Sequence, residues 1–117
     1  MPNMSFSKTK EQFCNRTKTV TRRIGKRRIL IGRRYTAIEK GMGLKKGEKV
    51  VPMGDFIPTS ARWEPLDRMI KEPEYGRQEV IKEGFPYLTP AQFVEMFCTM
   101  HHIPPDQLVN RIEYEYC

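Results

Sequence analysis

The chain has 117 residues, a length typical of a single domain spanning residues 1–117. Its hydrophobic fraction of 38% excludes an intrinsically disordered chain, and no apolar run approaches the roughly 20 residues that cross a bilayer. The first ten residues are polar and lack the apolar core of a signal peptide, so we expect a cytoplasmic protein without membrane contact. The three cysteines are far apart in the sequence and do not predict a disulfide framework.

The net charge of +7 is unevenly distributed along the chain. Residues 1–49 contain 15 Lys and Arg against 3 Asp and Glu, whereas residues 50–117 contain 6 against 11. Such an imbalance indicates a polyanionic partner, although a solvated basic face gives the same composition. The clustering of the cations favours RNA or a nucleotide as the partner. The residues that we expect to bind it are Arg16, Arg22, Arg23, Lys26, Arg27, Arg28, Lys45 and Lys46.

The first part of the chain predicts short strands and one helix. Good helix formers without Gly or Pro predict a helix over residues 8–15, and the β-branched run at residues 17–24 predicts a strand. Two other short strands are expected at residues 4–6 and 34–40. A Gly- and Lys-rich hairpin loop is expected to follow at residues 41–49.

Two later stretches also predict strands. Pro52 and Pro58 interrupt residues 50–65, and because proline cannot donate to a sheet ladder, we expect one or two strands at a sheet edge there. Residues 110–117 alternate strictly between apolar and charged side chains, a pattern typical of a half-buried strand. One face of this strand carries Ile112, Tyr114 and Tyr116, and the other carries Arg111, Glu113 and Glu115.

Three helices are expected between these strands, at residues 64–70, 73–84 and 88–101. Gly84 is placed to end the second helix. In the third, Thr89 is the expected N-cap and Gln92 completes a capping box. Strands at both ends of the chain, with helices inserted before the last strand, indicate an α+β fold with a mostly antiparallel, barrel-like sheet.

Four segments together are similar to a known family. They are SFSKTKEQFCNRTKTVTRR near the start, RYTAIEK with GLKKGEKV after it, EYGRQEVIKEGFPYLTPAQFVEMFC, and RIEYEY at the end. On these segments, over nearly its whole length, the chain resembles the ASCH family, small domains related to the PUA fold. GLKKGEKV and LTPAQFV are similar to its phage and prophage branch. The resemblance implies a PUA-like small β-barrel of mostly antiparallel strands, with flanking helices around a cleft.

The resemblance also implies a ligand and a chemistry. ASCH members are associated with RNA or nucleotide ligands; a small bacterial member hydrolyses N4-acetylcytidine, and a ribonuclease activity has been assigned to another. The family's hydrolase site combines Lys-x-x-Thr on the early strand with a glutamate from the helical region. Lys18 and Thr21 match the first part, and Glu83 is the best match for the glutamate, although the loop after it differs in length and sequence. The GKRR run after the early strand departs from a nucleoside amidohydrolase and favours a longer anionic ligand.

These three residue types can support amide hydrolysis without a cofactor. A threonine hydroxyl becomes nucleophilic when a base takes its proton, and lysine serves as that base when its ammonium is destabilised. Arg16, Arg22 and Arg23 are close to Lys18 in sequence, and like charges lower the pKa of a lysine. Positions three apart face opposite sides of a straight strand, so Lys18 is expected in the turn before the strand, unless the strand bends. None of the three is an expected core residue.

Other candidate sites are weaker. Cys98 and His102 are four residues apart on the last predicted helix, but two ligands do not complete a metal site, so no metal is expected. GMGLKKG lacks the spacing of a phosphate-binding loop. Trp63, the only tryptophan, is expected to pack against the protein more readily than to stack on a base.

Three hypotheses of function follow from these patterns. The first is a binding module whose basic cleft holds RNA, a nucleotide or a nucleoside. The second is an amidohydrolase for acylated nucleosides, with Thr21 as nucleophile, Lys18 as its base and Glu83 as proton donor or orienting group. The third is a ribonuclease, in which Lys18 and the arginines stabilise the charge that develops on the phosphate.

Overall fold

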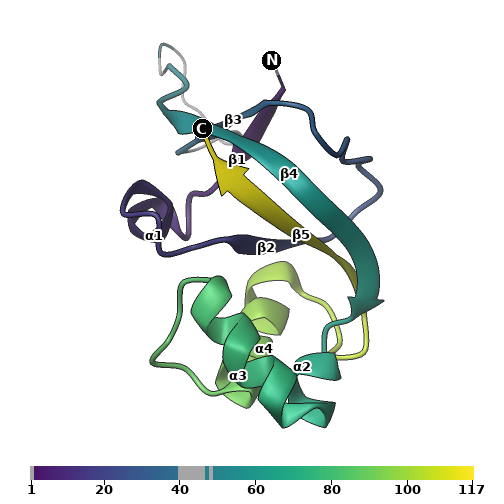
Figure 1. The fold of residues 1–117 in the computed structure, drawn as a ribbon. Helices are drawn as coiled ribbons and strands as arrows, with labels where there is room; N and C mark the ends of the chain where they lie inside the picture. The colour runs from purple at the N-terminus through teal and green to yellow at the C-terminus, as the bar shows by residue number, and fades with distance from the viewer. Residues whose placement is uncertain (1, 40–46, 48) are drawn as a thin grey trace.

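A curved sheet lies above helices α2, α3 and α4, and the short helix α1 packs beside the sheet (Figure 1). The computed structural model describes residues 2–39, 47 and 49–117. Its helices are α1 (Lys10–Cys14), α2 (Arg68–Lys71), α3 (Pro73–Lys82) and α4 (Pro90–His101). Its strands are β1 (Asn3–Ser5), β2 (Val20–Arg23), β3 (Tyr35–Ile38), β4 (Pro52–Pro65) and β5 (Leu108–Tyr116). None of these helices is long and apolar enough to cross a membrane.

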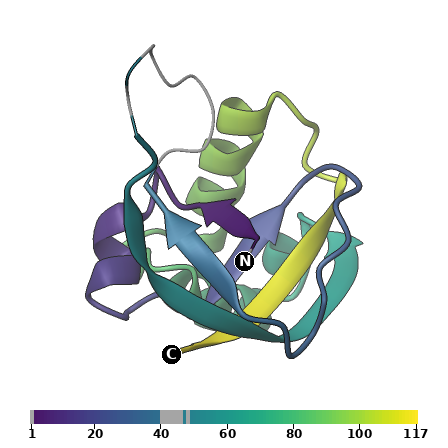
Figure 2. The same cartoon turned by 90° about the horizontal axis from the view of Figure 1, so that it is seen from above.

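The strands of the described residues form one sheet in the order β1-β3-β4-β5-β2. β1 pairs with β3 in parallel, and every other neighbouring pair is antiparallel. The sheet curls over, as Figure 2 shows, but β1 and β2 remain its two edges. The α+β class is therefore confirmed, whereas the expected barrel is not closed.

Side chains fill the seam between the two edge strands, hereafter the open seam. Arg23 at the end of β2 places its guanidinium over the ring of Phe6, which follows β1, with the guanidinium carbon 4.8 Å from the ring centroid. Ser5 and Arg23, one from each edge, line two pockets in this region. These side chains separate β1 from β2. The sheet therefore does not close through backbone hydrogen bonds between these two strands.

β4 lies between β3 and β5 in the sheet, but its two pairings share only Phe56, so the prediction of edge-type segments at residues 50–65 holds for each part of β4 on one side. It pairs with β3 on one side and with β5 on the other. Pro52 is its first residue, and Pro58 lies where the register with β5 shifts, between Pro58 and Ser60. Pro52 thus begins the strand, and the Pro58 backbone faces the β3 side, where its carbonyl accepts a hydrogen bond from the Gly32 backbone N at 2.9 Å and no strand of the described residues requires a donor from it.

Two apolar clusters hold the fold together. The first lies inside the curved sheet against α1 and contains Met4, Phe6, Phe13, Tyr35, Ala37, Phe56, Ile112 and Tyr114. The second joins the helices to the far ends of β4 and β5 and contains Leu66, Met69, Val80, Phe85, Phe93, Val94, Phe97 and Val109. The site described below lies where the two clusters meet.

Helices α3 and α4 begin and end as the sequence predicts. Thr89 caps α4: its hydroxyl accepts a hydrogen bond from the Gln92 backbone N at 3.1 Å, and Gln92 Oε1 accepts one from the Thr89 backbone N at 2.9 Å. Gly84 follows the end of α3 with φ of +95°. A Cβ at Gly84 would lie 2.7 Å from Cγ of Gln12 in α1, so glycine is required here for both conformation and space.

Strand β5 is buried on both faces over part of its length. Ile112 and Tyr114 are buried, as their alternation predicts. Arg111, expected on the solvent face, is also buried because α3 covers that face and Glu79 pairs with it. The expectation that Arg111 is exposed is therefore wrong, and this burial positions the charged residues of the site.

Candidate functional site

Lys18 lies in the segment just before β2, as its spacing from Thr21 predicts. Its carbonyl oxygen accepts hydrogen bonds from the hydroxyls of Tyr114 (3.0 Å) and Tyr116, and its backbone N donates to the Gln12 carbonyl at 3.3 Å. These bonds fix its backbone and direct the side chain into the protein, where the residue is only 2% exposed.

The Lys18 ammonium pairs with Glu83, the residue that ends α3. Lys18 Nζ lies 2.5 Å from Glu83 Oε1 and 3.0 Å from the Glu83 carbonyl oxygen. A helix C-terminus carries partial negative charge, so a cation is favourable there while a carboxylate alone is not. Lys18 therefore compensates both the Glu83 carboxylate and the end of α3, which explains why Glu83 is tolerated at that position.

Arg22 holds the other oxygen of the same carboxylate. Arg22 Nη1 lies 2.9 Å from Glu83 Oε2, and Arg22 Nη2 lies 2.5 Å from Oε1 of Glu79, one turn earlier on α3. Arg111 in turn donates to both Glu79 oxygens, at 2.5 and 3.0 Å. A continuous chain of ion pairs thus runs from β5 through α3 to Lys18 and fixes the position of Glu83.

A third carboxylate, Glu64 near the end of β4, completes the buried charges. Tyr75 donates a hydrogen bond to Glu64 Oε2 at 2.8 Å, and Arg68 donates to Glu64 Oε1 at 3.2 Å. Arg22 Nη2 lies 3.5 Å from Glu64 Oε2. The buried charges of the network balance, since its cations are Lys18, Arg22 and Arg111 and its anions are Glu64, Glu79 and Glu83. Buried charges are tolerated when they are paired in this way.

Burial and pairing shift the pKa values of this network. Burial lowers the pKa of Lys18 below its ordinary 10.5, and the neighbouring Glu83 offsets part of that effect. The sequence predicted this direction but attributed it to neighbouring arginines, of which Arg23 and Arg22 make smaller contributions. Burial alone raises the pKa of Glu79, but hydrogen bonds and charges of Arg111 and Arg22 outweigh it and hold the pKa at about 2.

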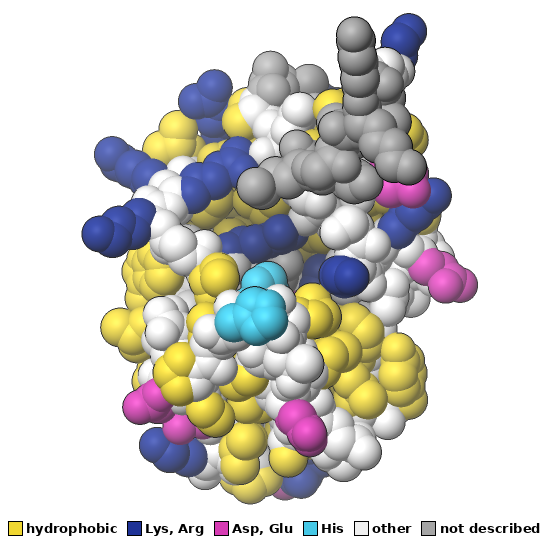
Figure 3. Space-filling model, turned by 180° about the vertical axis from the view of Figure 1, so that it is seen from behind, with side chains coloured by type: hydrophobic (Ala, Val, Ile, Leu, Met, Phe, Trp, Pro, Cys, Tyr) yellow, Lys and Arg dark blue, Asp and Glu magenta, His cyan; other side chains and the backbone are white. Residues whose placement is uncertain are grey.

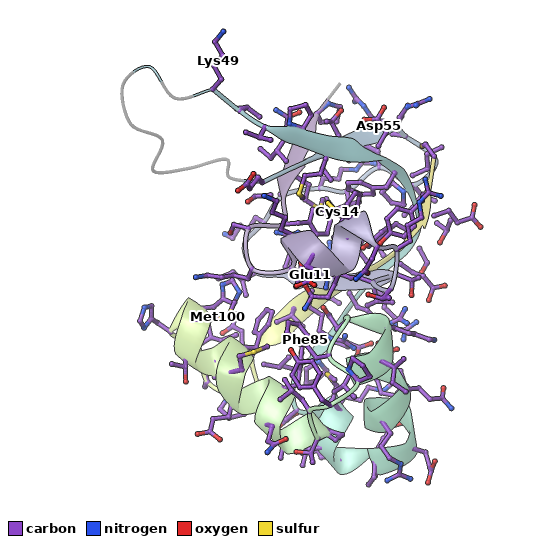
Figure 4. All side chains as sticks on the ribbon, turned by 90° about the vertical axis from the view of Figure 1, so that its left-hand side faces the viewer. Glu11, Cys14, Lys49, Asp55, Phe85 and Met100 are labelled. Carbon is purple, nitrogen blue, oxygen red and sulfur yellow. The ribbon has the colours of Figure 1, made fainter. Side chains whose placement is uncertain are left out.

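Lys18, Thr21 and Glu83 line one pocket of about 140 Å³, hereafter the first pocket. It lies at the free edge of β2, between the segment that follows β1 and the C-terminal half of α4. Its apolar wall includes Phe85 and Met100, which lie on the helical side of the boundary between helices and sheet (Figure 4).

All three residues predicted for catalysis are buried, so the expectation that none belongs to the interior is wrong. The reason is that α3 and α4 cover the end of β2, and the ion pairs compensate the charges there. The Thr21 hydroxyl has no hydrogen-bond partner among the described residues, whereas Lys18 and Glu83 are both paired. Of the three polar groups, the Thr21 hydroxyl is therefore the one that is free to contact a ligand.

Arg23 stands between this pocket and a second one. It lines both, and it forms no salt bridge with any described residue. Its Nε is buried without a hydrogen-bond partner. Burial lowers the pKa of Arg23 to about 10, which still leaves the guanidinium charged at neutral pH. Arg23 therefore presents to both pockets a positive charge that has no salt-bridge partner among the described residues.

The second pocket has a volume of about 390 Å³ and lies at the open seam. Met4 of β1, Ile24 after β2 and Ile38 of β3 contribute apolar walls. Trp63 of β4 and Asn110 of β5 also line it, and their strand positions pair with each other and with Arg23 in one row across the sheet.

The residues predicted to bind nucleic acid are not brought to one surface. Arg22 lines the first pocket, but its side chain is fully buried and its guanidinium is paired with Glu79 and Glu83. Arg16 is exposed, lies over the ring of Tyr116 and lines neither of the two pockets. The exposed predicted residues beside β2 are Lys26, Arg27 and Arg28. Lys45 and Lys46 lie outside the described residues.

The surface that carries the pockets is rich in cations. Figure 3 shows Lys and Arg side chains gathered on the sheet half of this face, above the histidines at the C-terminal end of α4. Arg27 both belongs to the exposed segment after β2 and lines the second pocket. The basic surface is therefore continuous with the pockets along the end of β2.

The sequence reasoning missed Glu79 and His101. Glu79 lies four residues before Glu83, a spacing that places both carboxylates on one face of α3, and this signal was available. His101 lines the first pocket from the last turn of α4, and burial lowers its pKa.

The described residues contain no group of three or more His, Cys, Asp or Glu that could hold a metal, and Cys98 is half-buried against the helical cluster.

No family model and no curated protein matches the sequence. The structure is similar to a crystal structure of protein EF3133 from Enterococcus faecalis V583, which is described under the family model DUF984. The two share 13% identity with a TM-score of 0.51, over 99% of this chain and 80% of that one. At this identity the similarity shows a shared α+β fold and nothing about activity. The resemblance to the ASCH family stays a prediction.

Proposed function

We propose that this protein is an ASCH-like binding module that takes a nucleotide unit of single-stranded RNA at the pockets beside β2. The observation that carries the proposal is Arg23, which lines both pockets, has a buried Nε without a hydrogen-bond partner and forms no salt bridge with the described residues. A half-buried cation that lacks a salt-bridge partner is incompletely solvated, so an anionic ligand would stabilise it. A phosphate supplies both the charge and the oxygen acceptors that a guanidinium binds.

The surrounding charge supports a longer anionic ligand. The six buried charges of the network cancel one another, so they do not attract a ligand from solution. The exposed cations of the segment after β2 are not cancelled by described acidic partners. They lie next to Arg23 in the chain, where they would hold phosphates that flank the bound unit.

A salt titration tests this proposal. An octamer of cytidylate RNA should bind the protein at low salt, with an affinity that falls steeply between about 50 and 200 mM. Lys26→Ala with Arg28→Ala should weaken binding and reduce the salt slope by about two. Lys71→Ala with Arg77→Ala, which removes the same charge from exposed positions on the helices, should change neither. Absence of binding at low salt, or binding that is indifferent to salt, contradicts the proposal.

A second candidate function is amide hydrolysis on an acylated nucleoside, and the convergence of Lys18, Thr21 and Glu83 on the first pocket favours it. Neutral Lys18 would take the proton of the Thr21 hydroxyl while the threonine oxygen bonds to the acyl carbon. The amide C–N bond then breaks, the amine leaves with a proton from Lys18, and an ester forms on Thr21. Water next cleaves that ester, which releases the carboxylic acid and restores the threonine.

In that reaction Glu83 would stabilise the ammonium that forms on Lys18, at a distance of 2.5 Å. Arg22 would act as a positioning residue because it holds Glu83, and Glu79 would hold Arg22 in turn. The test is incubation with N4-acetylcytidine and chromatographic detection of cytidine and acetate. If the wild type releases neither product from any acylated nucleoside, the hydrolase candidate fails and the binding module stands alone.

A further inference from the structure

The first and second pockets adjoin each other along the open seam. Both are lined by Ser5 from β1 and by Arg23 from β2. The first pocket, at about 140 Å³, is smaller than the roughly 300 Å³ at which pockets begin to hold complete small ligands. A nucleotide that places its base in the first pocket must therefore continue beyond it. The second pocket, at about 390 Å³, is the adjoining space.

The second pocket contains a buried polar atom that the protein leaves unsatisfied. Asn110 is only 5% exposed, and its Oδ1 has no hydrogen-bond partner among the described residues. A buried acceptor without a donor costs free energy, so such atoms in a pocket indicate a missing partner. A ligand that donates an N–H group from a planar amide or amine, as a nucleobase does, would satisfy it.

The same pocket offers a stacking surface. Trp63 lies opposite Asn110 in the sheet register, so the two side chains share a face of β4 and β5. Trp63 is 50% exposed, which leaves much of its ring accessible to a ligand. The remaining walls are mainly apolar, and Arg27 is the cation that lines the pocket besides Arg23. Aromatic and apolar walls, the polar side chains of Asn3, Ser5 and Asn110, and a flanking cation suit a base attached to a phosphate.

Arg23 lies where the two pockets meet, and its buried Nε has no partner among the described residues. A guanidinium binds phosphate oxygens with paired N–H donors. A phosphodiester between two nucleosides would present its charge at this junction when the nucleosides occupy one pocket each. The order of features along the seam is therefore pocket, cation, pocket, which is the order of base, phosphate and base in a dinucleotide.

We propose that the ligand unit is a dinucleotide step of a single-stranded nucleic acid, with one base in the first pocket, the phosphate at Arg23 and the second base on Trp63 with an N–H donor toward Asn110. This inference rests on the proposed binding function and specifies it further. It assigns the second base of the ligand to the second pocket. It also explains how the protein would prefer a nucleic-acid strand to a free nucleoside, because the free nucleoside can occupy only one of the two pockets.

The test compares two probes that each contain one phosphate group: cytidine 5′-monophosphate and the dinucleotide CpC. By calorimetry, CpC should bind about tenfold more tightly, which is within the range expected for one stacked base. CpC should also quench the fluorescence of Trp63, the only tryptophan, whereas the mononucleotide should leave it unchanged. The deoxy form of CpC shows whether the 2′-hydroxyl contributes to the preference.

Two variants separate the second pocket from the first. Trp63→Leu should remove most of the advantage of CpC and leave mononucleotide binding unchanged, and because Trp63 is half exposed the fold should survive. Asn110→Leu should act in the same direction, with thermal melting as a check on its folding. Tyr87→Leu is the matched control, since Tyr87 is exposed and lines neither pocket.

The outcomes distinguish this inference from the function on which it rests. If the mononucleotide binds but CpC binds no more tightly and does not quench Trp63, the dinucleotide site is overturned and the binding module stands. If Trp63→Leu binds CpC as tightly as the wild type, the second base does not stack there and the inference also fails. If neither probe nor longer RNA binds, both proposals are overturned.

Discussion

Lys18 and Glu83 are 65 positions apart in sequence, yet their side chains meet at 2.5 Å in the interior. Neither partner could be buried alone without a large loss of stability, so each depends on the other. Arg22 on the second Glu83 oxygen makes the group a triad of charges and not a simple pair. The same contact therefore serves the stability of the fold and the geometry of the first pocket.

Replacement of Lys18 by Met should lower the free energy of unfolding by about 3 kcal/mol, because it leaves a buried carboxylate with one cation fewer. Lys71→Met is the matched control: Lys71 pairs with Asp67 at 3.4 Å but is mostly exposed, so its loss should cost at most about 0.5 kcal/mol. Urea unfolding at neutral pH measures both. Equal, small losses in the two variants would show that the buried pair adds nothing.

Acid should destabilise the protein through Glu79. Its pKa of about 2 in the folded state lies below the ordinary 4.5, so its contribution is complete above about pH 4.5 and is lost as the pH falls toward 2. The difference corresponds to about 3 kcal/mol. Urea unfolding measured at intervals between pH 6 and pH 2.5 should show this decline, in addition to any decline from other carboxylates.

Glu79→Gln removes the titrating group and should flatten that part of the pH dependence while lowering stability at neutral pH. Glu95→Gln, at an exposed position on α4, should leave the profile of the wild type unchanged. A wild-type stability that stays constant down to pH 2.5 would contradict the assignment of a strongly lowered pKa to Glu79.

Capping and turn patterns in the sequence predicted where helices and strands lie, but not which strands would have neighbours on both sides. The capping box at Thr89 and the helix end at Gly84 depend on neighbours within a few residues, and both are confirmed. The central position of β4 depends on pairing with strands that are distant in sequence. Pro58 indicates an edge, and it lies on the part of β4 that pairs with β5 but not with β3, so this local signal is right on the β3 side.

The candidate site was predictable in part. The motif resemblance selected Lys18, Thr21 and Glu83, and the structure places them at one pocket. Their burial was missed, as was the internal role of Arg22, because a charged side chain is normally a surface residue unless a tertiary partner compensates it. Those partners come from helix α3 and strand β5, and no local pattern indicates such a pairing.

Gly84→Ala should destabilise the protein more than Gly32→Ala. Both glycines have positive φ, of +95° and +82°, so alanine costs about 1 kcal/mol at either position from backbone strain. Only at Gly84 does the new Cβ also meet an obstacle, with Cγ and Cβ of Gln12 at 2.7 and 2.8 Å, while Gly32 has nothing within 4 Å. The expected extra loss is about 1–2 kcal/mol, from overpacking. Equal losses in urea unfolding would show that Gln12 moves aside freely.

If Thr21 is the nucleophile of an amidohydrolase, turnover requires its hydroxyl and not the β-branched shape of its side chain. Thr21→Ser keeps the hydroxyl and should retain part of the turnover of N4-acetylcytidine. Thr21→Val keeps the shape and the strand preference of the residue, so it should fold and yet lose turnover. The rate of the wild type should rise with pH as Lys18 loses its proton, over a range below the ordinary lysine pKa of 10.5 because burial lowers it.

The substitutions Lys18→Ala, Thr21→Ala and Glu83→Ala should each abolish most of the activity, and their effects should be far from additive because the three residues act as one unit. Since Lys18 and Glu83 are buried charges, unfolding must be excluded for those two variants by circular dichroism before activity is compared. The pair Thr21→Ser and Thr21→Val avoids that ambiguity, because it changes no charge. Equal turnover by the wild type and Thr21→Val, followed as cytidine release by chromatography, would exclude Thr21 as the nucleophile and leave the ion pair of Lys18 and Glu83 as a structural feature of the pocket.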